Sequence, residues 1–196
     1  ARVCDAYNKL DVKCCLERLR EFHEMKLQVE HEFDLFAQIE FYESLWQGTF
    51  SMYSDYAETK LKVFSLQNYI DEHKEAYCLT HIDAVPDNFL ILNDGSIKLI
   101  DWEYAAMQDP HVDIAMFCIY AMYDKKAVDR LIDIYFENHC TINVRMKIYA
   151  YISVCGLLWS NWCEYKKTLG VDFGEYSLKQ YRYAKEYYKL VQAYIQ

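Results

Sequence analysis

The sequence predicts a mainly α-helical fold that carries one small β-hairpin. The 196-residue chain contains only 5 Gly and 2 Pro and is 53% hydrophobic, so it has little material for long loops and enough apolar surface for a core. Apolar residues also recur at spacings of three and four over long stretches, as they do on one face of an α-helix. We expect a single domain over residues 1–196.

Helical patterns lie on both sides of the middle of the chain. Three precede it, at residues 12–22, 35–45 and about 55–73. We expect these three helices to pack as antiparallel neighbours. Four more follow, at residues 114–123, 127–138, about 144–167 and about 176–195.

The middle of the chain has a different pattern. Residues 77–80 and 89–92 are short apolar runs, Asn93-Asp-Gly-Ser is a turn signal, and residues 97–101 resume the apolar pattern. A turn signal between two apolar runs predicts a β-hairpin. Polar loops precede and follow this hairpin, and loops held by a rigid scaffold are frequent sites of catalysis.

Composition excludes several classes of protein. The formal net charge of -9 argues against a nucleic-acid partner, which would require a basic face. The eight cysteines form no C-x-x-C pair and follow no secretory leader, so we expect a reduced, cytoplasmic chain. No apolar run approaches the roughly 20 residues that cross a bilayer, so we expect no membrane partner. The sequence carries no signal for an oligomeric state.

The polar loop before the hairpin reads His81-x-Asp83-x-x-x-x-Asn88, and the hairpin ends at Asp101. Phosphoryl transfer to a hydroxyl requires a carboxylate that accepts or orients the proton, and oxygen ligands for the Mg²⁺ that bridges the nucleotide phosphates. Asp83 suits the first task, while the Asn88 amide and the Asp101 carboxylate suit the second. An isolated H-x-D is usually a capped turn or a surface pair, so the prediction depends on the order and spacing of all these residues.

These motifs resemble those of the choline kinase and aminoglycoside phosphotransferase superfamily, which carry H-x-D-x-x-x-x-N and then I-D-[FW]-E. The resemblance implies the large C-terminal lobe of the protein-kinase-like fold and an ATP- and Mg²⁺-dependent small-molecule kinase. It implies that Asp83 is the catalytic base, that Asn88 and Asp101 ligate Mg²⁺ with the nucleotide, and that His81 braces the catalytic loop. Asp113 resembles the second Asp of the family segment D-P-x-x-D-[IL]-A, which steadies that loop.

Aromatic residues suggest the phosphate acceptor. Trp159 and Trp162 are three apart on a predicted helix, and Trp rings can hold a quaternary ammonium group by cation–π attraction with a nearby carboxylate. Two Trp on an apolar stripe are equally typical of a protein core, so both interpretations stay open. The carboxylate could be Asp83, Glu103 or Glu164. With the residues that the choline kinase resemblance implies, the predicted substrate-binding residues are Asp83, Glu103, Tyr104, Tyr120, Tyr123, Trp159 and Trp162.

A complete kinase of this superfamily also has a small N-terminal lobe, with a loop that covers the phosphates and a Lys that pairs with them. The sequence has no Gly-rich loop, so we expect that lobe to be absent from this chain and the present lobe to be nearly inactive alone. Ile82 stands where the family often has Gly, Asn or Arg. The expected substrate is choline or a similar amino alcohol. The alternatives are a kinase of aminoglycosides or other hydroxyl compounds, and a non-catalytic lobe that binds a ligand or a partner protein.

Overall fold

The structure is a computed structural model that describes residues 1–46 and 50–196. Its helices and a few short strands confirm the predicted fold class. The chain divides into two compact units, and each unit combines two segments of the sequence. The first unit contains Ala1–Phe33 and Glu75–Arg145, and the second contains Asp34–Lys74 and Met146–Gln196. The single domain expected from the sequence stays a prediction.

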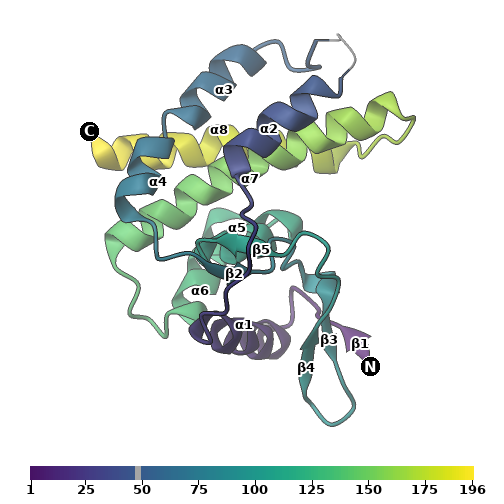
Figure 1. The fold of residues 1–196 in the computed structure, drawn as a ribbon, viewed down its shortest axis with the longest axis vertical. Coiled ribbons are helices and arrows are strands. Elements are labelled where there is room, and N and C mark those ends of the chain that lie inside the picture. Colours follow the sequence, from purple (N-terminus) through teal and green to yellow (C-terminus); the bar gives the residue numbers. More distant parts are fainter. Residues whose placement is uncertain (47–49) are drawn as a thin grey trace. The chain divides into compact units, whose positions relative to one another are not determined.

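Three helices form the frame of the first unit, and α6 packs against the other two (Figure 1). They are α1 (Lys9–Glu24), α5 (His111–Tyr120) and α6 (Lys125–Tyr135). The Asn8 side chain begins α1 by accepting hydrogen bonds from two backbone N–H groups of its first turn. Every residue of α5 except Tyr120 is buried, so this helix forms the core of the unit.

Two small sheets complete the first unit. In one, β3 (Phe89–Ile91) pairs antiparallel with both β1 (Arg2–Val3) and β4 (Ile97–Leu99). In the other, β2 (Cys78–Thr80) pairs antiparallel with β5 (Ala106–Gln108). The predicted hairpin is therefore confirmed as β3 and β4. Its turn uses Gly95 at a φ of +83°, a conformation that costs Gly little.

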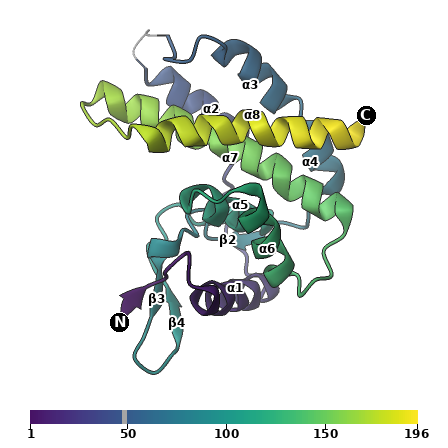
Figure 2. The same cartoon turned by 180° about the vertical axis from the view of Figure 1, so that it is seen from behind.

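The second unit consists of helices, which are α2 (Leu35–Ser44), α3 (Tyr56–Phe64), α4 (Gln67–His73), most of α7 (Ile142–Thr168) and α8 (Glu175–Ile195). The two long helices α7 and α8 lie side by side (Figure 2). Their closest approach is at Gly156, where a Cβ atom would lie 2.8 Å from the Gln180 carbonyl oxygen and 2.9 Å from the Tyr183 Cβ atom. Only a residue without a side chain fits this crossing.

Two of the helix predictions are wrong in part. The stretch predicted as one helix from about residue 55 to 73 is divided into α3 and α4 at Ser65, whose hydroxyl donates to the Lys62 carbonyl at 2.6 Å. Such side-chain hydrogen bonds compete with continued helix. The predicted antiparallel packing of the first three helices is also wrong, because α1 packs on α6 in the first unit and α3 packs on α8 in the second.

No disulfide joins any of the eight cysteines, all of which lie in the described part of the chain. Within residues 1–46 and 50–196, every helix is too short or too polar to cross a lipid bilayer.

Candidate active site

The β3–β4 hairpin brings the residues of the H-x-D-x-x-x-x-N motif and Asp101 to one place in the first unit. Just beyond the ladder, the Ile100 N–H donates to the Asn88 carbonyl at 3.0 Å, so Asn88 lies beside the residue that precedes Asp101. The Asn88 side-chain amide donates to the Asp83 carbonyl at 2.8 Å and to Asp83 Oδ2 at 3.0 Å. Asn88 thus connects the catalytic loop (residues 81–88) to the end of the hairpin, because its side-chain amide binds Asp83 while its backbone carbonyl binds Ile100.

Asp83 is half-buried, and its surroundings favour the protonated carboxyl more than water would. Burial raises the pKa of Asp83 above its ordinary value, and the charges of Asp101 and Asp113 raise it further, while the hydrogen bond from Asn88 opposes this. A carboxylate whose pKa is raised is a stronger base for a hydroxyl proton.

His81 lies wholly buried behind the catalytic loop. Its Nε2 atom is 2.9 Å from the Ile100 carbonyl oxygen, and its ring meets the Trp102 ring edge-on at a centroid distance of 4.6 Å. The imidazole therefore joins the loop to the end of β4. This position supports the bracing role predicted for His81.

Asp113 anchors the backbone of the same loop from the first turn of α5, where it is completely buried. Its Oδ1 atom accepts a hydrogen bond from the Ile82 N–H at 2.7 Å, and its Oδ2 atom accepts one from the His81 N–H at 3.0 Å. Ile82 has a φ of +69°, which is unfavourable for a β-branched residue. The carboxylate thus stabilises a backbone conformation that the Ile82 side chain disfavours.

The Asn88 and Asp101 side chains fit a Mg²⁺ ion. Because the Asn88 Nδ2 atom donates to Asp83, its Oδ1 atom is the one available to a cation, and the neighbouring Asp101 is exposed. Oxygen ligands of these types are those that Mg²⁺ prefers. No group of three or more His, Cys, Asp or Glu residues in the described ranges could hold a metal alone. A Mg²⁺ ion here would take its other ligands from water and nucleotide phosphates.

Tyr120, another predicted substrate residue, contacts the loop directly. It is half-buried at the end of α5, and its hydroxyl donates to Asp87 Oδ2 at 2.5 Å. Burial, with the hydrogen bond to Asp87, raises the pKa of Tyr120 to about 12, and the charge of Asp83 contributes. Asp87 is exposed within the H-x-D-x-x-x-x-N motif, and the sequence analysis missed it because it occupies one of the variable positions.

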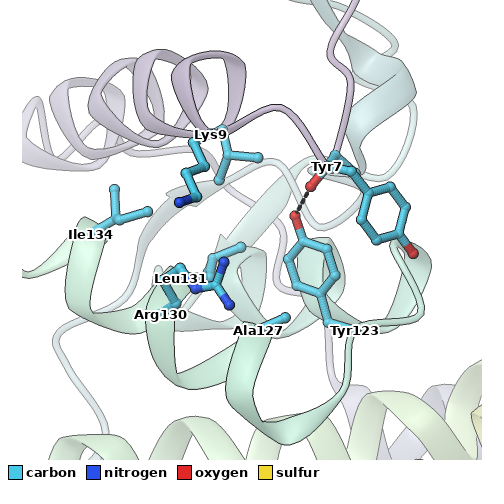
Figure 3. Close-up of a pocket in the computed structure, with 9 residues that line it drawn as sticks. Tyr7, Lys9, Tyr123, Ala127, Arg130, Leu131 and Ile134 are labelled. Carbon is cyan, nitrogen blue, oxygen red and sulfur yellow. Dashed lines mark hydrogen bonds between the residues drawn. The ribbon is translucent and has the colours of Figure 1, made fainter.

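The other predicted residues of the first unit have different surroundings. Tyr123 is buried against the N-terminal segment, where its hydroxyl donates to the Ala6 carbonyl (Figure 3). It lines a pocket of about 80 Å³ together with Lys9 and Arg130. Glu103 is exposed in the turn after Asp101, and the Tyr104 ring meets the Phe33 ring edge-on at 6.5 Å.

Trp159 and Trp162 lie on α7 in the second unit, with their rings stacked at a centroid distance of 6.3 Å. Trp159 is 8% exposed, whereas Trp162 is half-buried. The Lys166 Nζ atom lies 5.3 Å from the centre of the Trp162 ring, so this ring already contacts a cation. Glu164 accepts hydrogen bonds from the Ser51 hydroxyl at 2.8 Å and the Met52 N–H at 2.7 Å. Both of these donors belong to the second unit, like Glu164 itself.

Comparison with known proteins gives consistent matches. Residues 16–149 match the model of the phosphotransferase enzyme family. Protein LicA of Haemophilus influenzae strain Rd is 30% identical over 186 residues, which cover 88% of this chain and 68% of that protein. The crystal structure of choline kinase LicA from Streptococcus pneumoniae matches with a TM-score of 0.81 and 28% identity, over 96% of this chain and 66% of that one.

A structure of LicA in complex with AMP matches equally well, with a TM-score of 0.82 and 27% identity over 96% of this chain and 66% of that one. The chain therefore spans about two thirds of the length of these relatives.

Proposed function

Since this chain belongs to the phosphotransferase enzyme family, we propose that it is the catalytic lobe of an enzyme that transfers the γ-phosphoryl group of ATP to the hydroxyl group of choline. It has the predicted protein-kinase-like fold. The observation that carries the proposal is the convergence of Asp83, Asn88 and Asp101 at the end of the β3–β4 hairpin. Choline is favoured as the acceptor because a similar protein, with a TM-score of 0.81, is a choline kinase.

Asp83 acts on the acceptor in this proposal. Its carboxylate accepts a hydrogen bond from the choline hydroxyl and takes the proton as the oxygen attacks the phosphoryl group. The Asn88 amide both orients the Asp83 carboxylate and, with Asp101, would hold Mg²⁺. The bound ion would neutralise charge on the nucleotide phosphates. His81 and Asp113 keep the loop in the conformation that these contacts require.

Tyr120 and Asp87 form the proposed contact for the ammonium group of choline. A quaternary ammonium group has no N–H to donate, so it is held by aromatic faces and by negative charge. The Tyr120 hydroxyl donates to the exposed Asp87 carboxylate, which lies four residues after Asp83 in the same loop. In this proposal, the choline hydroxyl binds Asp83 and the ammonium group, two carbon atoms away, contacts the Tyr120–Asp87 pair. Glu103, Tyr104, Tyr123, Trp159 and Trp162 stay predicted substrate residues.

The acceptor is tested by offering three substrates to the protein expressed from its whole coding region. ADP release is measured with Mg-ATP and choline, ethanolamine or an aminoglycoside. We expect choline to give the highest kcat/KM. If the aminoglycoside alone is phosphorylated, choline is the wrong acceptor. If none of the three releases ADP above the rate without acceptor, the small-molecule kinase assignment fails for this protein.

A further inference from the structure

Asp113 has a third hydrogen-bond partner, which belongs to a different helix. The Nε2 atom of His23, on α1, lies 2.9 Å from Asp113 Oδ2. The same oxygen accepts the His81 N–H, and the other oxygen accepts the Ile82 N–H. A buried carboxylate is strongly disfavoured unless several donors surround it, and here two come from the loop and one from His23.

Asp113 on α5 and Tyr135 on α6 together determine which nitrogen of His23 carries the proton. The Asp113 carboxylate can only accept, so the Nε2 atom that lies 2.9 Å from it carries a proton. The Tyr135 hydroxyl is 2.8 Å from His23 Nδ1, and burial keeps it protonated by raising the pKa of Tyr135 above its ordinary value. In a neutral ring with its proton on Nε2, the Nδ1 atom accepts from this hydroxyl. Tyr135, His23 and Asp113 thus form one directed chain of hydrogen bonds.

This chain of hydrogen bonds leads through Asp113 to Ile82, the most strained residue of the catalytic loop. Ile82 combines a positive φ with a fully buried side chain, and it lies directly before Asp83. A residue in such a conformation keeps it only while surrounding contacts hold it. If Asp113 rotates, both the His81 and Ile82 N–H groups lose their acceptor, and the Asp83 carboxylate moves with the backbone.

We propose that His23 is a positioning residue for phosphoryl transfer, which fixes the Asp113 carboxylate and through it the place of Asp83. His23 contacts neither Asp83 nor the nucleotide ligands Asn88 and Asp101 in any hydrogen bond of the described residues, so its effect on the reaction is indirect. The kinetic part of this inference depends on the proposed function. The structural part, that His23 holds the loop, does not.

The surroundings of His23 allow a direct chemical test. His23 and Tyr135 line a groove of about 530 Å³ in the first unit, together with Arg20 and Phe136. Free imidazole can therefore reach the space that the ring leaves in a His23→Ala variant. There it can again donate to Asp113 and accept from Tyr135.

We expect His23→Ala to lower kcat about 100-fold, as a misplacement of about 1 Å can. The KM values for ATP and choline should change little, because the lost interaction serves the reaction and not substrate binding. His23→Gln keeps an N–H donor and should retain more activity, and added imidazole should restore part of the kcat of His23→Ala. The control His139→Ala removes an exposed histidine and should behave as wild type.

Amide hydrogen exchange gives a second readout that needs no activity. In His23→Ala the His81 and Ile82 amides should exchange faster than in wild type, while His139→Ala leaves them unchanged. Tyr135→Phe removes only the hydroxyl, so it should shift both readouts in the same direction but by less. It also serves as the test if His23→Ala does not fold.

Three results would overturn the inference. One is a normal kcat for folded His23→Ala, and another is a lowered kcat with unchanged exchange of the two loop amides. The third is an equal loss of kcat for His139→Ala. If the wild-type protein phosphorylates no acceptor, the proposed function fails by itself, and the exchange of the His81 and Ile82 amides then decides whether His23 holds the loop.

Discussion

Replacing Asp113 by Asn should strongly destabilise the first unit, although the two side chains have nearly the same shape. The carboxylate accepts three buried hydrogen bonds, from the Ile82 N–H at 2.7 Å, the His81 N–H at 3.0 Å and His23 Nε2 at 2.9 Å. An amide has a single acceptor oxygen, so at least one of these donors loses its partner and faces an NH₂ group.

The magnitude follows from the number of bonds that change. An unsatisfied buried donor costs about 1–3 kcal/mol, and each bond that stops being charge-assisted weakens by about 1 kcal/mol. The sum is about 3–5 kcal/mol, reduced by the relief of burying a neutral group, so we expect a net loss of about 3 kcal/mol. For a chain of this length that lowers Tm by about 6–12 °C.

Urea denaturation followed by circular dichroism measures this change. The matched control is Asp71→Asn, which alters an exposed carboxylate paired with Lys74 on the surface of α4 and should change the unfolding free energy by less than about 0.5 kcal/mol. If Asp113→Asn loses less than about 1 kcal/mol, the carboxylate does not hold the loop in the way that its three contacts indicate.

Four further predictions concern the acceptor, the pH dependence of activity, the effect of Asp83 on stability and the helix crossing. Asp87→Asn removes the charge that holds Tyr120, so KM for choline should rise about 5-fold with kcat nearly unchanged, equivalent to about 1 kcal/mol; a normal KM would exclude Asp87 from the acceptor site. Because Asp83 must be ionised and its pKa is raised, kcat/KM should fall as pH falls through a midpoint above the ordinary pKa of an aspartic acid, and a midpoint at or below that ordinary value would contradict the burial effect. The raised pKa of Asp83 also means that the folded state favours the protonated carboxyl. The protonated carboxyl therefore stabilises the fold at low pH, and this stability is lost as pH rises through the raised pKa of Asp83. Asp83→Asn should accordingly raise Tm near neutral pH, which thermal unfolding measures. Gly156→Ala should lower the unfolding free energy in urea by about 1–3 kcal/mol, because the new Cβ atom meets the backbone of α8, and unchanged stability would mean that the helices separate without loss.

The sequence predicted those parts of the fold that leave a periodic or local signal. The stripes that became α5 to α8 are long enough for the period of 3.6 residues to stand out, and the turn residues before Gly95 identify the hairpin. Strand β1 is only two residues long, and β5, which reads Ala106-Met-Gln, contains no β-branched or aromatic residue that would indicate a strand. The packing partners of α1 were also unpredictable, because an apolar stripe does not specify which surface covers it.

The residues of the candidate site also divide into those that a local motif predicts and those that only the packing of helices brings together. Asp83, Asn88 and Asp101 were predicted from their order and spacing around a hairpin, and the structure places Asn88 beside Asp83 and Ile100. His23 was missed, because a single His in a helix has no neighbouring motif and its role depends on contacts with α5 and α6. Tyr120 and Tyr123 were equivalent in the sequence. In the structure, the Tyr120 hydroxyl donates to Asp87 in the loop, whereas the Tyr123 hydroxyl donates to the Ala6 carbonyl.

The phosphoryl-transfer role of the segment from His81 to Asp101 is tested most directly by Asp83→Asn. The protein is expressed from its whole coding region as the wild type, as Asp83→Asn and as the surface control Asp71→Asn, and phosphocholine formation from Mg-ATP and choline is followed by ³¹P NMR. We expect phosphocholine from the wild type and from Asp71→Asn, and a rate at least about 100-fold lower from Asp83→Asn, the loss expected when a general base is removed. Phosphocholine formation by Asp83→Asn at the wild-type rate would contradict the assignment.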